Sequence, residues 1–344
     1  MNLYPSITVG LVVLNREWIV DRMLDALLSQ TYPKNKIHLI VVDGGSKDGT
    51  VSVIEKKVKN SNLASFETLV KKCNIPEGRN VCIDKMKGEI LVFWDSDEIM
   101  PENALEKLTR PIVEGKAEIV TVSEAYKVTL ETPAEIDQSV KKFYTGNFKA
   151  FSKVDIGGIG HVALAKNVFE KLKFDSDLTW IEDFDFLFRA KNYGFRIVKA
   201  EGLRSLDINL KDGNSDIVAS TPLKQCWRGL FKKAKLMVIY HLTTPNQTIF
   251  SYYRQNPRYI FYSGYPIAIA LSLYGFSSHS PLFESMFGLY FGFYLLWQLK
   301  KEKKLRKALK TTLRSLALGT PLSYSYLYYF LKYSLVSTKL QELK

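Results

Sequence analysis

Cysteine is scarce in this sequence. The 344 residues include three, Cys73, Cys82 and Cys226, and none of them belongs to a Cys-x-x-Cys pair. An odd number of unpaired cysteines does not build a disulfide framework. We therefore exclude a disulfide-rich secreted domain and expect a reduced environment that faces the cytosol.

Two further signatures are absent from the N-terminal region. The first apolar run has no basic segment before it and meets Asn15-Arg16-Glu17 too early to span a membrane, so it predicts a buried strand rather than a signal peptide. No Gly-x-Gly-x-x-Gly motif follows this strand. A dehydrogenase would need that motif to bind its dinucleotide, so this class of enzyme is excluded.

Acidic residues are too few to balance the basic ones. The chain has 35 Asp and Glu against 48 Lys and Arg, a net charge of +13. Such an excess implies an anionic partner, which can be nucleic acid, a membrane surface or a phosphorylated substrate. The basic residues concentrate beside the apolar runs of the second half of the chain, and no nucleic-acid recognition motif is present. We therefore expect no nucleic-acid partner.

Strand-like and helix-like patterns alternate along the chain up to residue 200. Short runs rich in apolar and β-branched residues predict buried strands at 7–14, 37–42, 90–94 and 119–122. Apolar residues at helical spacing predict helices at 18–29 and 50–58, and a further helix is expected at 184–192. This alternation is typical of an α/β domain, a mostly parallel sheet with helices on both faces.

The composition changes after residue 220. Residues 223–240 combine helical apolar spacing with lysines and arginines, as in an amphipathic helix at a membrane interface. Two apolar runs follow, at 259–276 and 281–299, with aromatic residues at their ends and basic residues outside them. These features predict a transmembrane hairpin with cytosolic flanks. The alternative is a pair of buried helices in a soluble α domain.

A third apolar segment, 316–336, is interrupted by Pro321 and Lys332, and three arrangements are open to it: it spans the membrane, re-enters it or lies along its surface. The lysines of the C-terminal tail favour a cytosolic end and hence a segment that does not span. The predicted domains are listed here in chain order: the α/β domain at 1–215, a basic interface helix and linker at 216–257, the hairpin at 258–300, and a basic, membrane-associated segment at 301–344. The α/β domain is expected to face the cytoplasm.

Acidic residues follow two of the predicted strands directly. Asp95-Ser96-Asp97 comes after the strand at 90–94, and the crevice beyond the carboxyl ends of parallel strands is where ligands bind. Two neighbouring carboxylates are suited to Mg²⁺ or Mn²⁺ bound to a diphosphate. The alternative is a solvated turn or a helix cap. Asp43 is placed to contact a nucleobase or ribose, or else it shapes the turn at Gly44.

Longer segments carry more information than any one motif. They are LVVLNRE at 11–17, LSQTYP at 28–33, VVDGGSKDGT at 41–50, EGRN at 77–80, GEI leading into DSD at 88–97, and IEDFDF at 181–186 with Arg189. In this order and spacing, over residues 5–200, they closely resemble family 2 glycosyltransferases, which are inverting enzymes with the GT-A fold. The resemblance departs at Gly44, where the family often has Asp, and at Gly78, where it often has Ala.

The resemblance implies a role for each matching residue. Asp183 would be the general base beside Glu182, and Asp97, with Asp95, would hold Mg²⁺ or Mn²⁺. The residues implied in binding the nucleotide sugar are Leu14, Asn15, Glu17, Asp43, Arg79, Asp95 and Ser96. His161 follows a glycine-rich run that the family places near the acceptor, so it is a candidate contact of acceptor or metal. Its alternative is a hydrogen-bonded structural histidine.

These roles predict an inverting transfer of a sugar from a nucleoside-diphosphate sugar to a hydroxyl group, carried by a lipid-linked saccharide at the membrane. One alternative is a polyprenyl-phosphate sugar synthase, whose ionised acceptor needs no general base. The pair Glu182-Asp183 therefore favours a hydroxyl acceptor. The other alternative is a binding protein with the same fold but no catalysis. Such a protein would be expected to lose acids at Asp43, Asp97 or Asp183, and all three are present.

Overall fold

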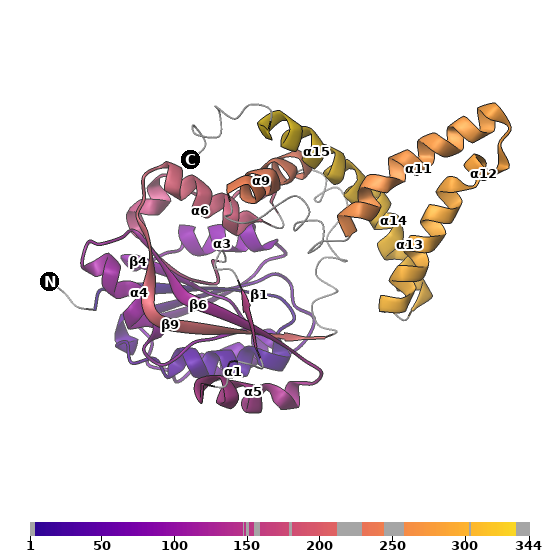
Figure 1. The fold of residues 1–344 in the computed structure, drawn as a ribbon. Coiled ribbons are helices and arrows are strands. Elements are labelled where there is room, and N and C mark those ends of the chain that lie inside the picture. The colour runs from indigo at the N-terminus through magenta and orange to yellow at the C-terminus, as the bar shows by residue number, and fades with distance from the viewer. Residues whose placement is uncertain are drawn as a thin grey trace. The chain divides into compact units, whose positions relative to one another are not determined.

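The structure is a computed structural model that describes residues 4–146, 148, 151–154, 159–178, 181–211, 229–243, 258–302 and 304–334. Contacts between residues divide the chain into two compact units, Met1–Val218 (unit 1) and Ala219–Lys344 (unit 2). Unit 1 is an α/β domain, and the described part of unit 2 is helical (Figure 1).

A mixed β-sheet forms the centre of unit 1. Its strands are β1 (Ile7–Val13), β2 (Ile37–Asp43), β3 (Ser65–Val70), β4 (Ile90–Trp94), β5 (Glu98–Ile99), β6 (Ile119–Leu130), β7 (Ser152–Val154), β8 (His161–Ala165) and β9 (Ile197–Leu210). They lie in the order β3-β2-β1-β4-β8-β6-β9-β5, with β7 beside β6. The sheet is parallel from β3 to β4. Beyond β4 it is mixed, because β8 is antiparallel to both neighbours while β6 and β9 are parallel.

Helices cover both faces of this sheet. One buried apolar cluster includes residues of α1 (Glu17–Leu28), α2 (Thr50–Val58), α4 (Ala104–Val113) and α5 (Ile136–Tyr144), and the other includes residues of α3 (Ile75–Asp84) and α6 (Glu182–Asn192). Successive side chains of a strand point to opposite faces. On β4, accordingly, Val92 and Trp94 belong to the first cluster, while Leu91 and Phe93 belong to the second.

The strands and helices predicted in unit 1 are confirmed. β1, β2 and β4 match the predicted strands at their starts, β6 extends well beyond the predicted 119–122, and α1, α2 and α6 lie where helices were expected. Strands β3 and β9 were not predicted. β3 is half-exposed at the edge of the sheet, and β9 alternates apolar residues with charged ones such as Lys199 and Arg204, so neither forms a continuous apolar run.

Unit 2 contains α9 (Leu230–Thr243), α11 (Arg258–Ser278), α12 (Pro281–Glu284), α13 (Met286–Glu302), α14 (Leu305–Arg314) and α15 (Thr320–Ser334). α11 and α13 contact each other as a hairpin that turns through α12 (Figure 1). A π-helical turn, Ser315–Gly319, joins α14 to α15. The predicted interface helix at 223–240 lies partly outside the described residues, and its described part belongs to α9.

The prediction of a transmembrane hairpin at 258–300 is not supported. The hairpin forms, but within the described residues no helix combines the length and the apolar character that crossing a membrane requires. The reason lies in the composition of the two helices, because glycine and tyrosine recur along both and lower their hydropathy. In addition, α11 carries serines, and α13 is 17 residues long and ends in charged residues.

Candidate active site

The carboxyl ends of β1, β2 and β4 form one edge of the sheet. The strand order reverses at β1, because β2 pairs with it on one side and β4 on the other. In open α/β sheets ligands bind beyond the strand ends at this point. Asp43 is the last residue of β2, and Asp95 directly follows β4. The structure therefore places both predicted acids at the edge where a ligand is expected.

The loop after β1 is tied to the loop after β2. The backbone N–H of Asn15 donates to Oγ of Ser46 over 2.8 Å, and the Asn15 side chain accepts from the N–H of Lys47 over 2.8 Å. The Glu17 carboxylate accepts from the N–H of Gly49 over 2.8 Å. Asn15 and Glu17, both predicted to bind the nucleotide sugar, thus have structural partners, and they shape the rim of the site.

Asp43 organises the turn that follows it. Its buried carboxylate accepts from the N–H groups of Gly45 over 3.0 Å and Ser46 over 2.8 Å, and also from the Ser46 hydroxyl. This is the turn-shaping alternative considered for Asp43. Leu14, the other predicted contact in this region, is half-buried at the end of β1.

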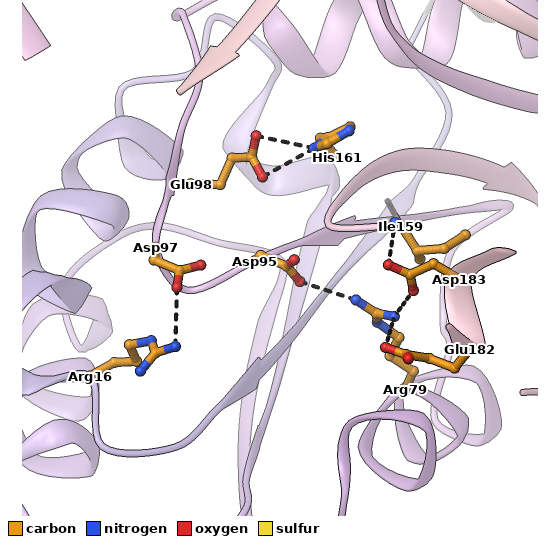
Figure 2. A network of polar contacts seen from close by, with 9 residues as sticks. All are labelled: Arg16, Arg79, Asp95, Asp97, Glu98, Ile159, His161, Glu182 and Asp183. Carbon is orange, nitrogen blue, oxygen red and sulfur yellow. Dashed lines mark hydrogen bonds and ion pairs between the residues drawn. The ribbon is translucent and has the colours of Figure 1, made fainter. Parts of the chain in front are cut away.

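Arg79 lies at the centre of the acidic network. Its guanidinium, on α3, contacts Asp95 over 3.4 Å and Glu182 over 3.4 Å, and it donates to Asp183 at shorter range (Figure 2). Only 4% of its side chain is exposed. Burial disfavours its charge, but Asp183, Asp95 and Glu182 outweigh burial and raise the pKa of Arg79. The predicted nucleotide contact is therefore turned inward, where it joins the acids after β4 to those of α6.

The two acids at the start of α6 bind protons more tightly than free carboxyls. Burial and the neighbouring Asp183 raise the pKa of Glu182 to about 7, although Arg79 opposes the shift. Burial also raises the pKa of Asp183, against the opposing effect of Arg79. The N–H of Ile159 donates to Asp183 over 3.1 Å and fixes the direction of its carboxylate. A carboxylate with a raised pKa is suited to accept a proton near neutral pH.

The backbone is strained directly before these acids. Ile181 has a φ of 73°. This left-handed conformation is unfavourable for a β-branched side chain and costs on the order of 1–3 kcal/mol. Such strain persists where the surrounding structure enforces it, and it often accompanies functional sites. Here the strained residue sets the start of α6, which carries Glu182 and Asp183.

Asp97 pairs with a different arginine. Nη2 of Arg16 lies 3.1 Å from Oδ2 of Asp97. Burial raises the pKa of Asp97 to about 6, helped by Asp95 and Glu98 and opposed by Arg16. Ser96 between the two aspartates is buried. The acids thus hold more negative charge than their neighbours neutralise.

A divalent cation would relieve this mutual repulsion. Mg²⁺ and Mn²⁺ are commonly held by one or two carboxylates together with phosphate oxygens of the substrate, so a complete cage of protein ligands is not required. Among the residues that the structure describes, no group of three or more His, Cys, Asp or Glu is arranged to hold an ion by itself. Asp95 and Asp97 therefore fit a metal that is shared with a diphosphate.

His161 is paired with a residue that sequence reasoning missed. Nδ1 of His161 lies 3.1 Å from both carboxylate oxygens of Glu98, and both side chains are buried (Figure 2). Burial disfavours the charged ring, but Glu98 outweighs it and raises the pKa of His161. Nε2 of His161 is buried without a hydrogen-bond partner in the described residues. The pairing supports the structural alternative for His161, while Nε2 leaves one nitrogen available to a ligand.

Asp207 is a second acid that sequence reasoning missed. It lies opposite Glu98 where β9 pairs with β5. Burial together with Asp97 and Glu98 raises the pKa of Asp207 to about 7. The acidic run from Asp95 to Glu98 was visible in the sequence. The approach of Asp207 to this run could not be predicted, because it depends on the pairing of strands that are distant in the sequence.

Comparison with known proteins agrees with this architecture. Residues 8–173 match the family described as glycosyl transferase family 2. This part of the chain is a family 2 glycosyltransferase domain. It is therefore an enzyme domain. Its α/β architecture is the GT-A fold. The sequence-based prediction of a glycosyltransferase is therefore confirmed at this level.

Relatives of the glycosyltransferase domain match over part of their length. The poly(ribitol-phosphate) beta-N-acetylglucosaminyltransferase TarS of Staphylococcus aureus is 27% identical over 108 residues, 31% of this chain and 19% of that protein. The poly(ribitol-phosphate) beta-glucosyltransferase of Bacillus spizizenii is 33% identical over 101 residues, 29% of this chain and 16% of that protein. The matched stretch thus spans less than a fifth of these relatives.

A solved structure resembles the chain more widely. Residues 1–349 of S. aureus TarS in complex with UDP-GlcNAc align with a TM-score of 0.51 at 16% identity, covering 96% of this chain and 92% of that one. At this identity the likeness concerns the fold alone.

Proposed function

We propose that the protein is an inverting glycosyltransferase that moves a sugar from a nucleoside-diphosphate sugar to the hydroxyl group of a lipid-linked saccharide, with its catalytic domain on the cytoplasmic side of a membrane. The observation that carries this proposal is the position of Arg79 between Asp95 and the pair Glu182-Asp183. One guanidinium joins an acid beyond the parallel strands, where a nucleotide binds, to acids suited to deprotonate an acceptor.

Asp183 is the proposed general base. The hydroxyl oxygen of the acceptor attacks the anomeric carbon as its proton passes to the Asp183 carboxylate, and the bond to the nucleoside diphosphate breaks on the opposite face. The N–H of Ile159 and the Arg79 guanidinium hold that carboxylate in place. Proton transfer of this kind contributes typically ~10²–10⁴-fold to the rate. Glu182, whose pKa is raised by burial, is the proposed acceptor-binding residue beside the base.

Asp97 and Asp95 are the proposed holders of Mg²⁺ or Mn²⁺. A bound cation of this type would offset the negative charge that develops on the leaving diphosphate. Arg16, which pairs with Asp97, would add positive charge beside this carboxylate. The relatives named for transfer of N-acetylglucosamine and glucose support a nucleotide-sugar donor for this chain as well.

The activity is tested with the purified chain, a panel of nucleotide sugars and a lipid extract as acceptor. We expect one donor to be consumed and its sugar to appear in the lipid fraction, with the anomeric configuration inverted by NMR. Retention of configuration would contradict the proposed mechanism. Transfer that goes to a polyprenyl phosphate would instead identify the alternative synthase, and hydrolysis without transfer would contradict the lipid-linked acceptor.

A further inference from the structure

The hairpin of unit 2 has polar groups inside. Oγ of Ser272 on α11 accepts from the N–H of Phe287 on α13 over 2.9 Å. Nε2 of Gln298 donates to the Tyr294 hydroxyl over 2.7 Å, and that hydroxyl lies 3.1 Å from Oγ of Ser315. These four side chains, of Ser272, Tyr294, Gln298 and Ser315, are all buried. Hydrogen bonds therefore hold together the interior of this hairpin and its junction with the next helix.

The outside of the same hairpin is apolar. Its aliphatic and phenylalanine side chains that are more than half exposed are Ile267 (58%), Leu273 (65%) and Phe276 (64%) on α11, Leu282 (67%) on α12, and Leu289 (62%), Phe293 (63%) and Leu296 (66%) on α13. A helix that faces water normally shows the reverse, with its apolar stripe toward the core. A contiguous exposed apolar surface marks an interaction site.

Helix α14, which contacts α13, has exposed apolar and basic side chains as well. Leu305, Leu309 and Leu313 recur every four residues and are exposed by 63%, 39% and 50%. Arg306 and Lys310 lie beside them and are exposed as well. An exposed leucine ridge flanked by basic side chains is the pattern of a helix that lies in a membrane interface, because long basic side chains can reach the headgroups while the leucines enter the acyl region.

The positive charge of the chain belongs almost wholly to unit 2. Met1–Val218 has 30 Lys and Arg against 32 Asp and Glu, a net −2, whereas Ala219–Lys344 has 18 against 3, a net +15. The excess of +13 is therefore not spread over the enzyme domain but gathered on the unit with the exposed apolar helices. A second copy of this unit would carry the same charge and repel it, while an anionic surface would attract it.

We propose that the exposed face of α11–α14 docks on an anionic lipid bilayer, with the apolar side chains of the hairpin and of α14 entering the boundary between headgroups and acyl chains and Arg306 and Lys310 contacting lipid phosphates. This mode of attachment lies in the interface rather than across the bilayer. Only the role of this docking, which is to bring the enzyme to a lipid-linked acceptor, rests on the proposed function.

Flotation of the full-length chain with vesicles tests the docking. We expect binding to vesicles of phosphatidylcholine mixed with phosphatidylglycerol, weaker binding at high salt, and much weaker binding to phosphatidylcholine alone. Arg306→Glu with Lys310→Glu should weaken binding to the mixed vesicles at least ~30-fold. The matched control is Lys56→Glu with Lys59→Glu, which reverses two exposed lysines of unit 1 and should leave binding unchanged.

The apolar contribution is tested separately. Leu273→Gln with Leu289→Gln should weaken binding to both kinds of vesicle, whereas Val70→Gln, at a residue of unit 1 that is 66% exposed, should not. Unchanged helicity by circular dichroism shows that the variants fold. Equal binding to charged and uncharged vesicles would overturn the proposal. So would a lipid-free oligomer that the leucine substitutions dissociate, since the face would then join two copies of the chain.

The docking and the proposed enzyme activity fail in different ways. Asp183→Asn should bind vesicles as the unchanged protein does, because the substitution lies in unit 1. If the activity proposal is wrong, vesicle binding still follows the pattern above. If the docking is wrong, sugar transfer to a short-chain, water-soluble acceptor persists while vesicle binding is absent.

Discussion

Nη2 of Arg16 lies 3.1 Å from Oδ2 of Asp97, and 10% and 18% of the two side chains are exposed. Removing one partner of a largely buried ion pair leaves the other charge uncompensated, which typically costs about 3–5 kcal/mol. We expect Arg16→Gln to lower the free energy of unfolding by about 3 kcal/mol in EDTA. In Arg16→Gln with Asp97→Asn the two effects should not add. Chemical denaturation measures both, and strict additivity would show that the pair is not coupled.

Asp183→Asn should reduce sugar transfer by roughly 10²–10⁴-fold, because an amide cannot take the proton of the acceptor. Binding of the donor should change little. The matched control is Asp84→Asn, since Asp84 is an acid of unit 1 that pairs with Lys173 at the surface. Initial rates at saturating donor distinguish the two variants. Full activity of Asp183→Asn would remove this residue from the mechanism.

The pH dependence of transfer should report the pair at the start of α6. The pKa of Glu182 is raised to about 7 by burial and Asp183, so the pair gives up its last proton as the pH rises through this range. Burial also raises the pKa of Asp183, which must lose its proton to act as the base, so the rate should rise with pH and level off once both acids are ionised. Glu182→Gln removes the neighbouring negative charge, which should lower the pKa of Asp183 and move the rise to lower pH. A profile of kcat against pH that does not shift would contradict this coupling.

Gly160 gives the site a steric test. Its carbonyl oxygen accepts from the N–H of Asp95 over 2.8 Å, and a methyl group on its Cα would overlap the Asp95 carboxylate. Gly160→Ala should therefore displace Asp95 and weaken metal-dependent donor binding about tenfold or more, an effect of ~1.4 kcal/mol. Gly288→Ala is the control, because nothing lies within 4 Å of the position that its methyl group would take. Calorimetric titration with a nucleoside diphosphate and Mn²⁺ compares them.

Asp207 predicts a dependence of stability on pH. Burial with Asp97 and Glu98 raises its pKa from 3.8 to about 7, so the folded chain keeps a proton that the unfolded chain releases. The resulting stabilisation is present below pH 4 and is lost as the pH rises to 7. At pH 8 in EDTA, Asp207→Asn should raise the melting temperature of unit 1 by roughly 2–4 °C, the effect of about 1 kcal/mol. An unchanged or lower value at pH 8 would contradict the raised pKa.

The local sequence pattern was sufficient to predict the central strands of the fold. It was insufficient to predict which side chains of the candidate site contact one another. β1, β2 and β4 are buried on both faces, so each forms a continuous apolar run, and the acids that follow them mark the ligand-binding edge. Arg79 and Asp183 are 104 residues apart, and only the packing of α3 beside α6 brings them together. The approach of Asp207 to Glu98 likewise depends on β5 pairing with β9, two strands with no strong signal of their own.

The second half of the chain shows the limit of hydropathy counted along the sequence. Apolar runs at 259–276 and 281–299 predicted spanning helices, but the count does not record on which side of a helix each residue lies. The structure separates the faces, with Ser272 and Gln298 buried and Leu273 and Leu296 exposed. Helices of intermediate mean hydropathy can therefore expose apolar side chains and bury polar ones.

That inverted arrangement gives the two halves of the chain opposite solvent requirements. Unit 1 is stabilised when water drives its leucines and valines together. The helices α11–α14 bury hydrogen-bonding groups and leave many apolar side chains exposed. In water, the hydrophobic effect therefore contributes little to the stability of these helices. A mild detergent or lipid should therefore raise the melting temperature of the helical half while leaving that of the enzyme half almost unchanged. The difference between the melting temperatures of the two units should therefore change with the detergent or lipid that is present.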